Sequence, residues 1–221
     1  MNYSGQTIIL PAKTEKALLD AVLCSAGFAA FAFFVADPFP SKLAAFIPLF
    51  MSAFIISRTI NWSLVSFPFL FRSAFSHTMP AFNIIGLLMG IAGAMYYRGS
   101  FGMPVLPAVI RAFIWVAICI AVMEELLFRG FIQGRLSGLH PGFAILFAAF
   151  AHASYKACLF LSPAVRHHPS LALFYTWTFG ASLLIGLLSH YSKSILPAII
   201  AHVVFDIIVY AENLQAPWWV W

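Results

Sequence analysis

Long apolar stretches separated by short polar segments run along nearly the whole chain. Most of them approach the ~20 residues that a helix needs to cross the hydrocarbon of a bilayer. They are continuous apolar runs, whereas strands of a transmembrane β-barrel alternate over ~10 residues. We therefore expect an all-α, polytopic membrane helical bundle of about seven to eight transmembrane helices. The expected spans are residues 17–36, 42–57, 80–97, 105–135, 141–161, 171–189 and 194–213.

Residues 59–79 fit two interpretations, because Trp62, Pro68, Arg72 and His77 interrupt their apolar pattern. The segment could lie in the membrane interface, or it could form an eighth, broken span. No polar region of the chain is long enough to form a separate soluble domain. We therefore expect a single transmembrane domain over residues 1–221.

Composition strengthens this interpretation, because 62% of the residues are hydrophobic and only 9% are charged. Soluble domains contain about 25% charged residues. The formal net charge of +5 comes from basic residues scattered among short loops. Such residues are better explained by topology and by contact with lipid headgroups than by nucleic acid. We expect membrane lipids as partners, and no nucleic acid.

The distribution of basic residues also indicates an orientation. With seven spans, the loops on the N-terminal side carry six lysines and arginines, and the loops on the opposite side carry three. The positive-inside rule then places the N-terminus in the cytoplasm. An eighth span in residues 59–79 would change this argument. The short loops and the lack of eukaryotic targeting features favour a multi-pass protein of a prokaryotic cell (inner or plasma) membrane.

Candidate chemistry begins with two adjacent carboxylates, Glu124 and Glu125, which follow the uncharged stretch of residues 112–122. An ionisable side chain at bilayer depth costs roughly 2.5–3.5 kcal/mol on insertion scales. Two in a row must be paired, neutralised or used. This part of the chain is therefore the first place to look for an active site.

Other polar residues inside the spans fall at related depths. Glu124 lies eleven residues before the end of the fourth expected span, and His152 lies eleven residues after the start of the fifth. At 1.5 Å per residue, both sit ~16 Å from the loop between these helices. His202 lies about 12 Å into the last span, and Asp206 lies one turn deeper. These four residues can share one layer of the bundle.

Spacing separates the two glutamates. Glu125 and Arg129 are four residues apart and can form a structural ion pair on one helix face. Glu124 points about 100° away and needs another partner. A carboxylate beside imidazoles is a suitable general base for activating water. Two bland alternatives stay open: His152 could bond a backbone carbonyl on a neighbouring helix, and Asp206 could merely orient His202.

The ordered motifs resemble the CPBP family of intramembrane proteases. That family includes the CAAX prenyl endopeptidases and the bacteriocin-processing or immunity-associated (ABI) membrane proteins. The resemblance covers about residues 105–210, and it rests on three motifs in order: Glu124-Glu125-x-x-x-Arg129, His152, and His202-x-x-x-Asp206.

The resemblance implies an all-helical intramembrane endopeptidase. By position, Glu124 would be the general base that activates water, with assistance from His152. His202 and Asp206 would match the pair that steadies the tetrahedral oxyanion or the site. Glu125 and Arg129 would be structural supports of the first motif.

Two positions depart from the family pattern. Ala148 stands where a phenylalanine usually precedes the motif histidine by four residues, and Asp206 stands where asparagine is frequent. An aspartate is a poor oxyanion donor unless it is protonated. It could instead orient His202 or favour a metal, since a Glu/His/His/Asp set can hold Zn²⁺. On the family analogy we expect a metal-free, glutamate-type mechanism without a cofactor, and zinc is the alternative.

We therefore expect an intramembrane peptidase that hydrolyses a peptide bond of a membrane-embedded or lipid-anchored protein or peptide. One alternative is a non-catalytic membrane immunity or partner protein on the same scaffold. Another is a proton-coupled transporter, in which carboxylates and histidines also line the interior. The small size of the chain and the lack of repeated, Gly/Pro-broken half-helices argue against the transporter.

Overall fold

The computed structural model describes residues 2–3, 6–7, 13–60, 78–162 and 170–213, and nearly all of them are helical. A small antiparallel hairpin precedes the helices and pairs Asn2 with Thr7. α5, the π-helix η3 and α6 follow one another without a break. In chain order the elements are β1 (Asn2–Tyr3), β2 (Gln6–Thr7), α1 (Thr14–Phe34), α2 (Leu43–Thr59), α4 (Met79–Ser100), α5 (Ile114–Glu125), η3 (Leu126–Gln133), α6 (Gly134–Leu136), α7 (Pro141–Leu161), α8 (Leu171–Ser192) and α9 (Leu196–Tyr210).

The helices form a membrane bundle, as the apolar pattern predicts. Four of those described, α1, α4, α7 and α8, are long and apolar enough to cross a membrane, with mean hydropathy of 1.5 to 2.0. α2 and α9 are also apolar but have only 17 and 15 residues. The all-α membrane fold is thus confirmed, and the described ranges hold fewer full-length spans than the expected seven to eight. Of the ambiguous segment 59–79, residues 61–77 lie outside the described residues.

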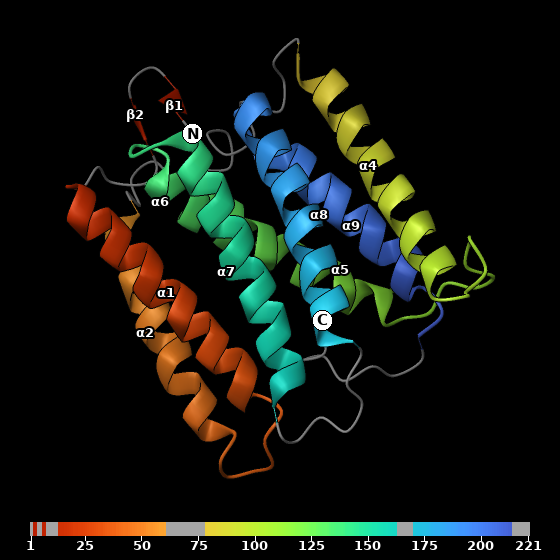
Figure 1. The fold of residues 1–221 in the computed structure, drawn as a ribbon, viewed down its shortest axis with the longest axis horizontal. Coiled ribbons are helices and arrows are strands. Elements are labelled where there is room, and N and C mark those ends of the chain that lie inside the picture. The colour runs from red at the N-terminus through yellow and green to blue at the C-terminus, as the bar shows by residue number, and fades with distance from the viewer. Residues whose placement is uncertain (1, 4–5, 8–12, 61–77, 163–169, 214–221) are drawn as a thin grey trace.

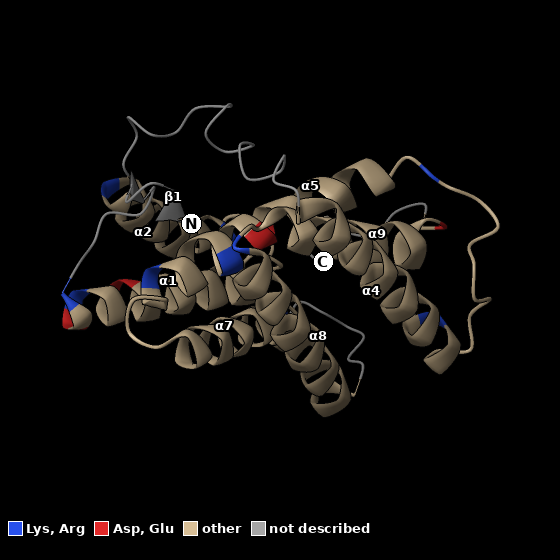
Figure 2. Cartoon of the chain, turned by 90° about the horizontal axis from the view of Figure 1, so that it is seen from above, with Lys and Arg blue, Asp and Glu red and all other residues tan. Residues whose placement is uncertain are grey.

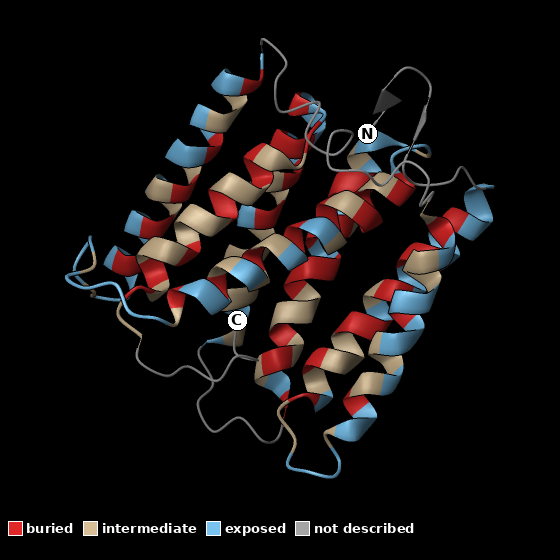
Figure 3. Cartoon of the chain, turned by 180° about the vertical axis from the view of Figure 1, so that it is seen from behind, coloured by how far each residue is buried: buried red, intermediate tan, exposed pale blue. Residues whose placement is uncertain are grey.

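The surface and the interior show the polarity expected in lipid. Charged residues colour only small parts of the helices, and most of the ribbon is uncharged (Figure 2). Large apolar side chains such as Phe50, Leu88 and Trp115 are exposed on the outer faces. Buried positions lie along the inward-facing sides of the helices (Figure 3). Several of the buried side chains are charged, so the polar groups of this protein are concentrated inside.

The bundle has two sides that meet at α7 and α8. α1 packs against α2 and α7, while α9 packs against α4, α5 and α8 (Figure 1). Between α1, η3 and α7 lies an apolar core that includes Phe28, Phe128 and Ile132. This packing holds α5, α7 and α9, which carry the candidate residues, around one central region.

The fourth span differs from expectation, because helix α5 begins at Ile114 rather than near residue 105. Pro104 and Pro107 lie at the start of the expected span, and proline disfavours a helix interior. Two backbone N–H groups of the 101–113 segment instead donate hydrogen bonds to residues that follow α9. Ala108 N donates to Glu212 Oε1 at 2.8 Å, and Arg111 N donates to the Ala211 carbonyl at 2.8 Å.

Arg98 at the end of α4 fastens the same region. Its side chain is fully buried, and its Nε donates to the Pro104 carbonyl at 2.6 Å. Its Nη1 donates to the Ile208 carbonyl at 3.0 Å, and its Nη2 pairs with Glu212 Oε2 at 2.8 Å. A single guanidinium therefore ties α4, the 101–113 segment and the end of α9 together.

Local sequence signals set the starts of the helices that carry the site. Pro141 occupies the first turn of α7, and the preceding His140 caps it by accepting from Phe143 N at 3.3 Å. Pro197 similarly lies in the first turn of α9. Between α8 and α9, Lys193 adopts a left-handed conformation with φ of 53° and ends α8. These boundaries fix how deep His152 and His202 lie in the bundle.

Candidate active site

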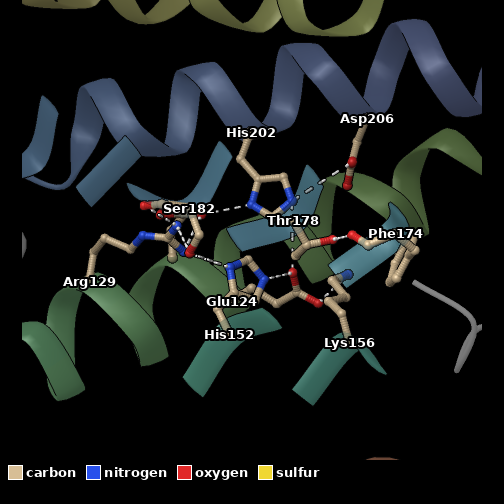
Figure 4. Close-up of polar contacts among 10 residues, drawn as sticks. Glu124, Arg129, His152, Lys156, Phe174, Thr178, Ser182, His202 and Asp206 are labelled. Carbon is tan, nitrogen blue, oxygen red and sulfur yellow. Dashed lines mark hydrogen bonds and ion pairs between the residues drawn. The ribbon is translucent and has the colours of Figure 1, made fainter. Parts of the chain in front are cut away.

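Glu124, His152, His202 and Asp206 lie in one buried layer formed by α5, α7 and α9 (Figure 4). Side-chain atoms of His152 and His202 approach the same oxygen of Glu124, at 3.0 and 3.8 Å. Asp206 lies one turn beyond His202, with 3.8 Å between Oδ1 and Nε2. The structure therefore brings together the four residues that their depths along the sequence placed in one layer.

Both oxygens of Glu124 have a partner. Oε2 lies 3.0 Å from His152 Nε2, and Oε1 lies 2.6 Å from the ammonium nitrogen of Lys156. Lys156 was not among the candidates from sequence. Its signal was present, because it follows His152 by four residues within an apolar helix and so lies on the same helix face.

Glu125 forms the predicted ion pair and has a second role. Its Oε1 accepts from Arg129 Nη1 at 3.0 Å and from His202 Nδ1 at 2.7 Å. Because an ionised carboxylate only accepts hydrogen bonds, His202 must carry a proton on Nδ1. Glu125 thus orients one histidine of the layer in addition to supporting its own helix.

Arg129 orients the other histidine. Its Nη1 lies 3.0 Å from His152 Nδ1, and its Nη2 donates to the hydroxyl of Ser182 at 2.7 Å. A guanidinium has no acceptor, so Nδ1 of His152 must accept this bond. The ring proton of His152 then sits on Nε2 and points at Glu124.

The contacts of His152 are with side chains from α5, η3 and α8. The ring contacts the side chains of Glu124, Arg129 and Ser182 and stacks on Phe128 at 4.5 Å between ring centroids. No bond to a backbone carbonyl is described for it. Ser182, which has no nucleophile motif around it, serves as a hydrogen-bond partner on α8 for Arg129 and for His152 Nδ1.

His202 presents its second nitrogen to two carboxylates. Nε2 lies 3.8 Å from both Glu124 Oε2 and Asp206 Oδ1. These separations are too long for direct hydrogen bonds. Asp206 therefore does not fix the ring by a direct bond, and Glu125 does so instead. The three atoms converge on one region, which is where a reacting molecule would meet a carboxylate and an imidazole together.

The π-helix begins immediately after the two glutamates. η3 spans Leu126–Gln133 and contains Arg129, so the chain changes its winding inside the first motif. Such π segments are rare and are frequent at functional sites. The spacing of Glu125 and Arg129 revealed their pairing but gave no sign of this change.

Zinc is the alternative to a metal-free mechanism, and its ligands would come from the buried layer. Nδ1 of each histidine is engaged, by Glu125 or by Arg129, so only Nε2 of each ring faces Glu124, and the ammonium group of Lys156 lies against Glu124 Oε1. Among the described residues, no group of three or more His, Cys, Asp or Glu side chains is placed to hold a metal. A metal-free mechanism stays a prediction.

One comparison with known proteins finds a similar family. The family model described as type II CAAX prenyl endopeptidase, Rce1-like, matches residues 106–208. This range contains all four residues of the buried layer, as well as Glu125 and Arg129. The match confirms the resemblance to the CPBP family and indicates a peptidase of the CAAX protease type. No match is found among curated proteins or among solved structures.

Proposed function

We propose that this chain, whose residues 106–208 belong to the Rce1-like CAAX prenyl endopeptidase family, hydrolyses peptide bonds within the membrane by means of a water activated by Glu124. One observation carries the proposal. The buried carboxylate of Glu124 accepts a hydrogen bond from His152 Nε2 at 3.0 Å, and Nε2 of His202 lies 3.8 Å from the same oxygen. Arranged in this way, a carboxylate and two imidazoles supply the base and the proton donors that amide hydrolysis needs.

In the first step, Glu124 takes a proton from water while the hydroxide oxygen bonds to the carbonyl carbon of the scissile peptide. The electron pair of the carbonyl π bond moves to its oxygen and creates an oxyanion. The negative charge thus passes from Glu124 to the substrate. The buried layer keeps bulk water away, which strengthens each electrostatic contact during this transfer.

In the second step, the oxyanion reforms the carbonyl and the C–N bond breaks. The leaving nitrogen takes a proton from His152 Nε2, and His152 regains a proton from the acid form of Glu124. The products are one carboxyl and one amine terminus, with one water consumed. The Arg129 bond to Nδ1 suits this role, because it keeps the transferable proton on the Nε2 side.

His202 is proposed to stabilise the oxyanion. With Nδ1–H bound to Glu125, a further proton on Nε2 makes that atom a donor toward the reacting centre. Asp206 supports this charged form from 3.8 Å, and so an acidic residue serves here without donating to the oxyanion itself. Removal of an oxyanion donor typically costs about 10²–10³ in kcat.

The proposed substrate is a membrane-embedded or lipid-anchored protein or peptide in the cell membrane. The apolar bundle places the reacting groups among buried side chains of membrane helices, so a substrate tied to the bilayer would reach them more readily than a soluble one. The family description points to prenylated tails as the first probe. Peptide leaders and membrane-anchored sorting signals are the other classes to test.

A cleavage assay in proteoliposomes tests the proposal. The probes are a fluorogenic farnesylated peptide with a CAAX ending and a panel of lipid-anchored leader peptides. We expect Glu124→Gln to lower kcat by about 10²-fold or more, because the general base is lost. Asp37→Asn, a carboxylate-to-amide change in the loop after α1, serves as the matched control and should retain activity.

Three outcomes would redirect the proposal. Cleavage by Glu124→Gln at the wild-type rate would exclude Glu124 as the base. Loss of wild-type cleavage with a chelator, restored by zinc, would favour the metal-dependent alternative, whereas we expect chelators to have no effect. A chain that binds the probes tightly but cleaves none of them would fit the non-catalytic partner protein.

A further inference from the structure

Among the described residues, Lys156 is a charged side chain that contacts Glu124 and takes no part in the proposed proton transfers. Resting on the proposed function, we propose that Lys156 is a positioning residue that holds one oxygen of Glu124 and balances the charge of the buried layer during hydrolysis. Its Nζ lies 2.6 Å from Glu124 Oε1, closer than either histidine comes to the same carboxylate.

Two residues of α7 grip the Glu124 carboxylate from one side. His152 meets Oε2 and Lys156, one helical turn later, meets Oε1 (Figure 4). α5 otherwise packs mainly on α9, and α7 packs mainly on α1 and α8. These polar contacts therefore set the angle of the carboxylate, and they turn Oε2 toward both histidines.

Charge balance gives the second argument. The layer contains three carboxylates, those of Glu124, Glu125 and Asp206, all nearly inaccessible to solvent. Arg129 is committed to Glu125 and to Ser182. Without Lys156, Glu124 would be left with only histidine rings as partners. An unpaired buried charge is costly, and the opposite charge of Lys156 at 2.6 Å offsets part of that cost.

The same lysine can serve the whole reaction. When Glu124 takes a proton from water, its charge disappears and an equal charge forms on the oxyanion nearby. The total charge is unchanged by this transfer, and a fixed cation in the layer offsets one negative charge both before and after it. The Lys156 side chain is 12% exposed, and its Nζ lies 6.0 Å from the centre of the Tyr155 ring, so it stays close to the carboxylate at the edge of the layer.

Kinetic variants separate this role from a direct role in substrate binding. For Lys156→Met, we expect kcat on a cleaved probe peptide to fall at least about 10-fold with KM changed less than about 2-fold. Lys156→Arg should retain more activity than Lys156→Met, because it keeps the charge. Lys42→Met, which changes a partly exposed lysine before α2, is the matched control. A raised KM with unchanged kcat would show that Lys156 holds the substrate, and would overturn the proposal.

Chemical rescue distinguishes an electrostatic role from simple packing. Lys156→Ala should regain part of its kcat on addition of n-propylammonium, which supplies the lost cation, and not on addition of n-propanol, which has a similar size. Rescue by both additives alike, or by neither, would contradict the proposed charge balance.

A measurement that needs no activity keeps the two proposals apart. Thermal unfolding in detergent is compared for Glu124→Gln, Lys156→Met and the double variant. We expect each single change to lower Tm more than the double change does, because each leaves a buried charge unpaired. If the Tm changes of the two single variants add up in the double variant, and the wild type cleaves a probe, the Lys156 proposal alone is overturned. If the Tm changes are coupled but the wild type cleaves no probe, the proposed function and the kinetic role of Lys156 are overturned, and only the ion pair is left.

Discussion

At the scale of residues, the pair formed by Glu125 and Arg129 fixes both histidines at once. Glu125 accepts from His202 Nδ1, and Arg129 donates to His152 Nδ1. Nδ1 is therefore protonated in His202 and unprotonated in His152, although both rings face the same Glu124. The proposed steps need a base and two differently protonated imidazoles. The ion pair of Glu125 and Arg129 fixes the protonation of both imidazoles.

The role of Arg129 can be tested by Arg129→Lys. A lysine ammonium cannot reach Glu125, His152 and Ser182 together, because it lacks the planar fork of a guanidinium. We expect kcat on a cleaved probe to fall by up to ~10²-fold, since a misoriented general acid loses most of its contribution. Arg58→Lys, at the end of α2, is the control. Unchanged kcat in Arg129→Lys would refute the orienting role.

Much of the site was accessible from sequence, and the exceptions have physical causes. Depth in the spans predicted the shared layer of Glu124, His152, His202 and Asp206. Helical spacing predicted the pair of Glu125 and Arg129. The shared acceptor on Glu125 and the contacts of Lys156 and Ser182 depend on how α7, α8 and α9 approach one another. Spacing along one helix carries no information about such contacts between helices.

At the scale of elements, close packing of α4 on α9 sets the position of His202. A Cβ placed at Gly90 would lie 2.5 Å from the Ala201 carbonyl oxygen, and one at Gly86 would approach the Pro197 carbonyl even more closely. The two glycines are one turn apart on α4. The helix backbones can approach so closely only because neither position has a side chain.

Gly90→Leu should therefore push α9 away and disturb His202. We expect a loss of about 1–3 kcal/mol in the free energy of unfolding, as is usual for overpacking, together with reduced kcat. Both are measurable by thermal unfolding in detergent and by the cleavage assay. Gly99→Leu on the same helix is the control, because a Cβ there meets no atom within 4 Å. Equal effects of the two substitutions would contradict the packing argument.

The 101–113 segment is not helical, although its apolar residues predicted the start of a span. Its prolines were visible in the sequence, but the anchor formed by Arg98 and Glu212 joins positions more than 100 residues apart. Such a contact has no local signal. The boundary of α5 was therefore the part of the fold that the apolar pattern predicted least well.

This anchor gives a pH-dependent prediction. Glu212 lies beyond the end of α9, where hydrogen bonds from Arg98 and from Ala108 N lower the pKa of its carboxyl below the ordinary 4.5. Because the folded pKa is the lower one, the pair stabilises the fold above about pH 4.5, and this contribution is lost as pH falls through the folded pKa. Glu212→Gln should lower Tm at pH 7, and its difference from wild type should shrink as the pH falls below 4.5. A constant difference would argue against the ion pair.

At the scale of the whole molecule, the N-terminal helices are integrated with the family-like part although they lie outside residues 106–208. Phe28 of α1 packs edge to face on Phe128 of η3, with ring centroids 6.1 Å apart. Asp20 of α1 and Arg135 of α6 form a buried ion pair. These contacts join α1 to the helices that carry the two glutamates, so changes in α1 can shift the buried layer.

The orientation in the membrane is a prediction for the complete chain. The excess of lysines and arginines in loops on the N-terminal side predicts a cytoplasmic N-terminus. An epitope tag fused to the N-terminus should therefore resist protease added to intact spheroplasts and become sensitive after lysis. Digestion in intact spheroplasts would contradict the predicted orientation.

The π-helix η3 gives the rod from Ile114 to Leu136 a fixed angular register. Glu124, Glu125 and Arg129 on this rod point to the side of the buried layer, while Arg135 near its end faces Asp20 on α1. Removing one residue from η3 would rotate everything beyond it about the helix axis relative to the glutamates. Either the glutamates or Arg135 would then face the wrong neighbour. The length of this segment is therefore as constrained as the identity of the motif residues, and natural insertions or deletions should be absent there even where its side chains vary.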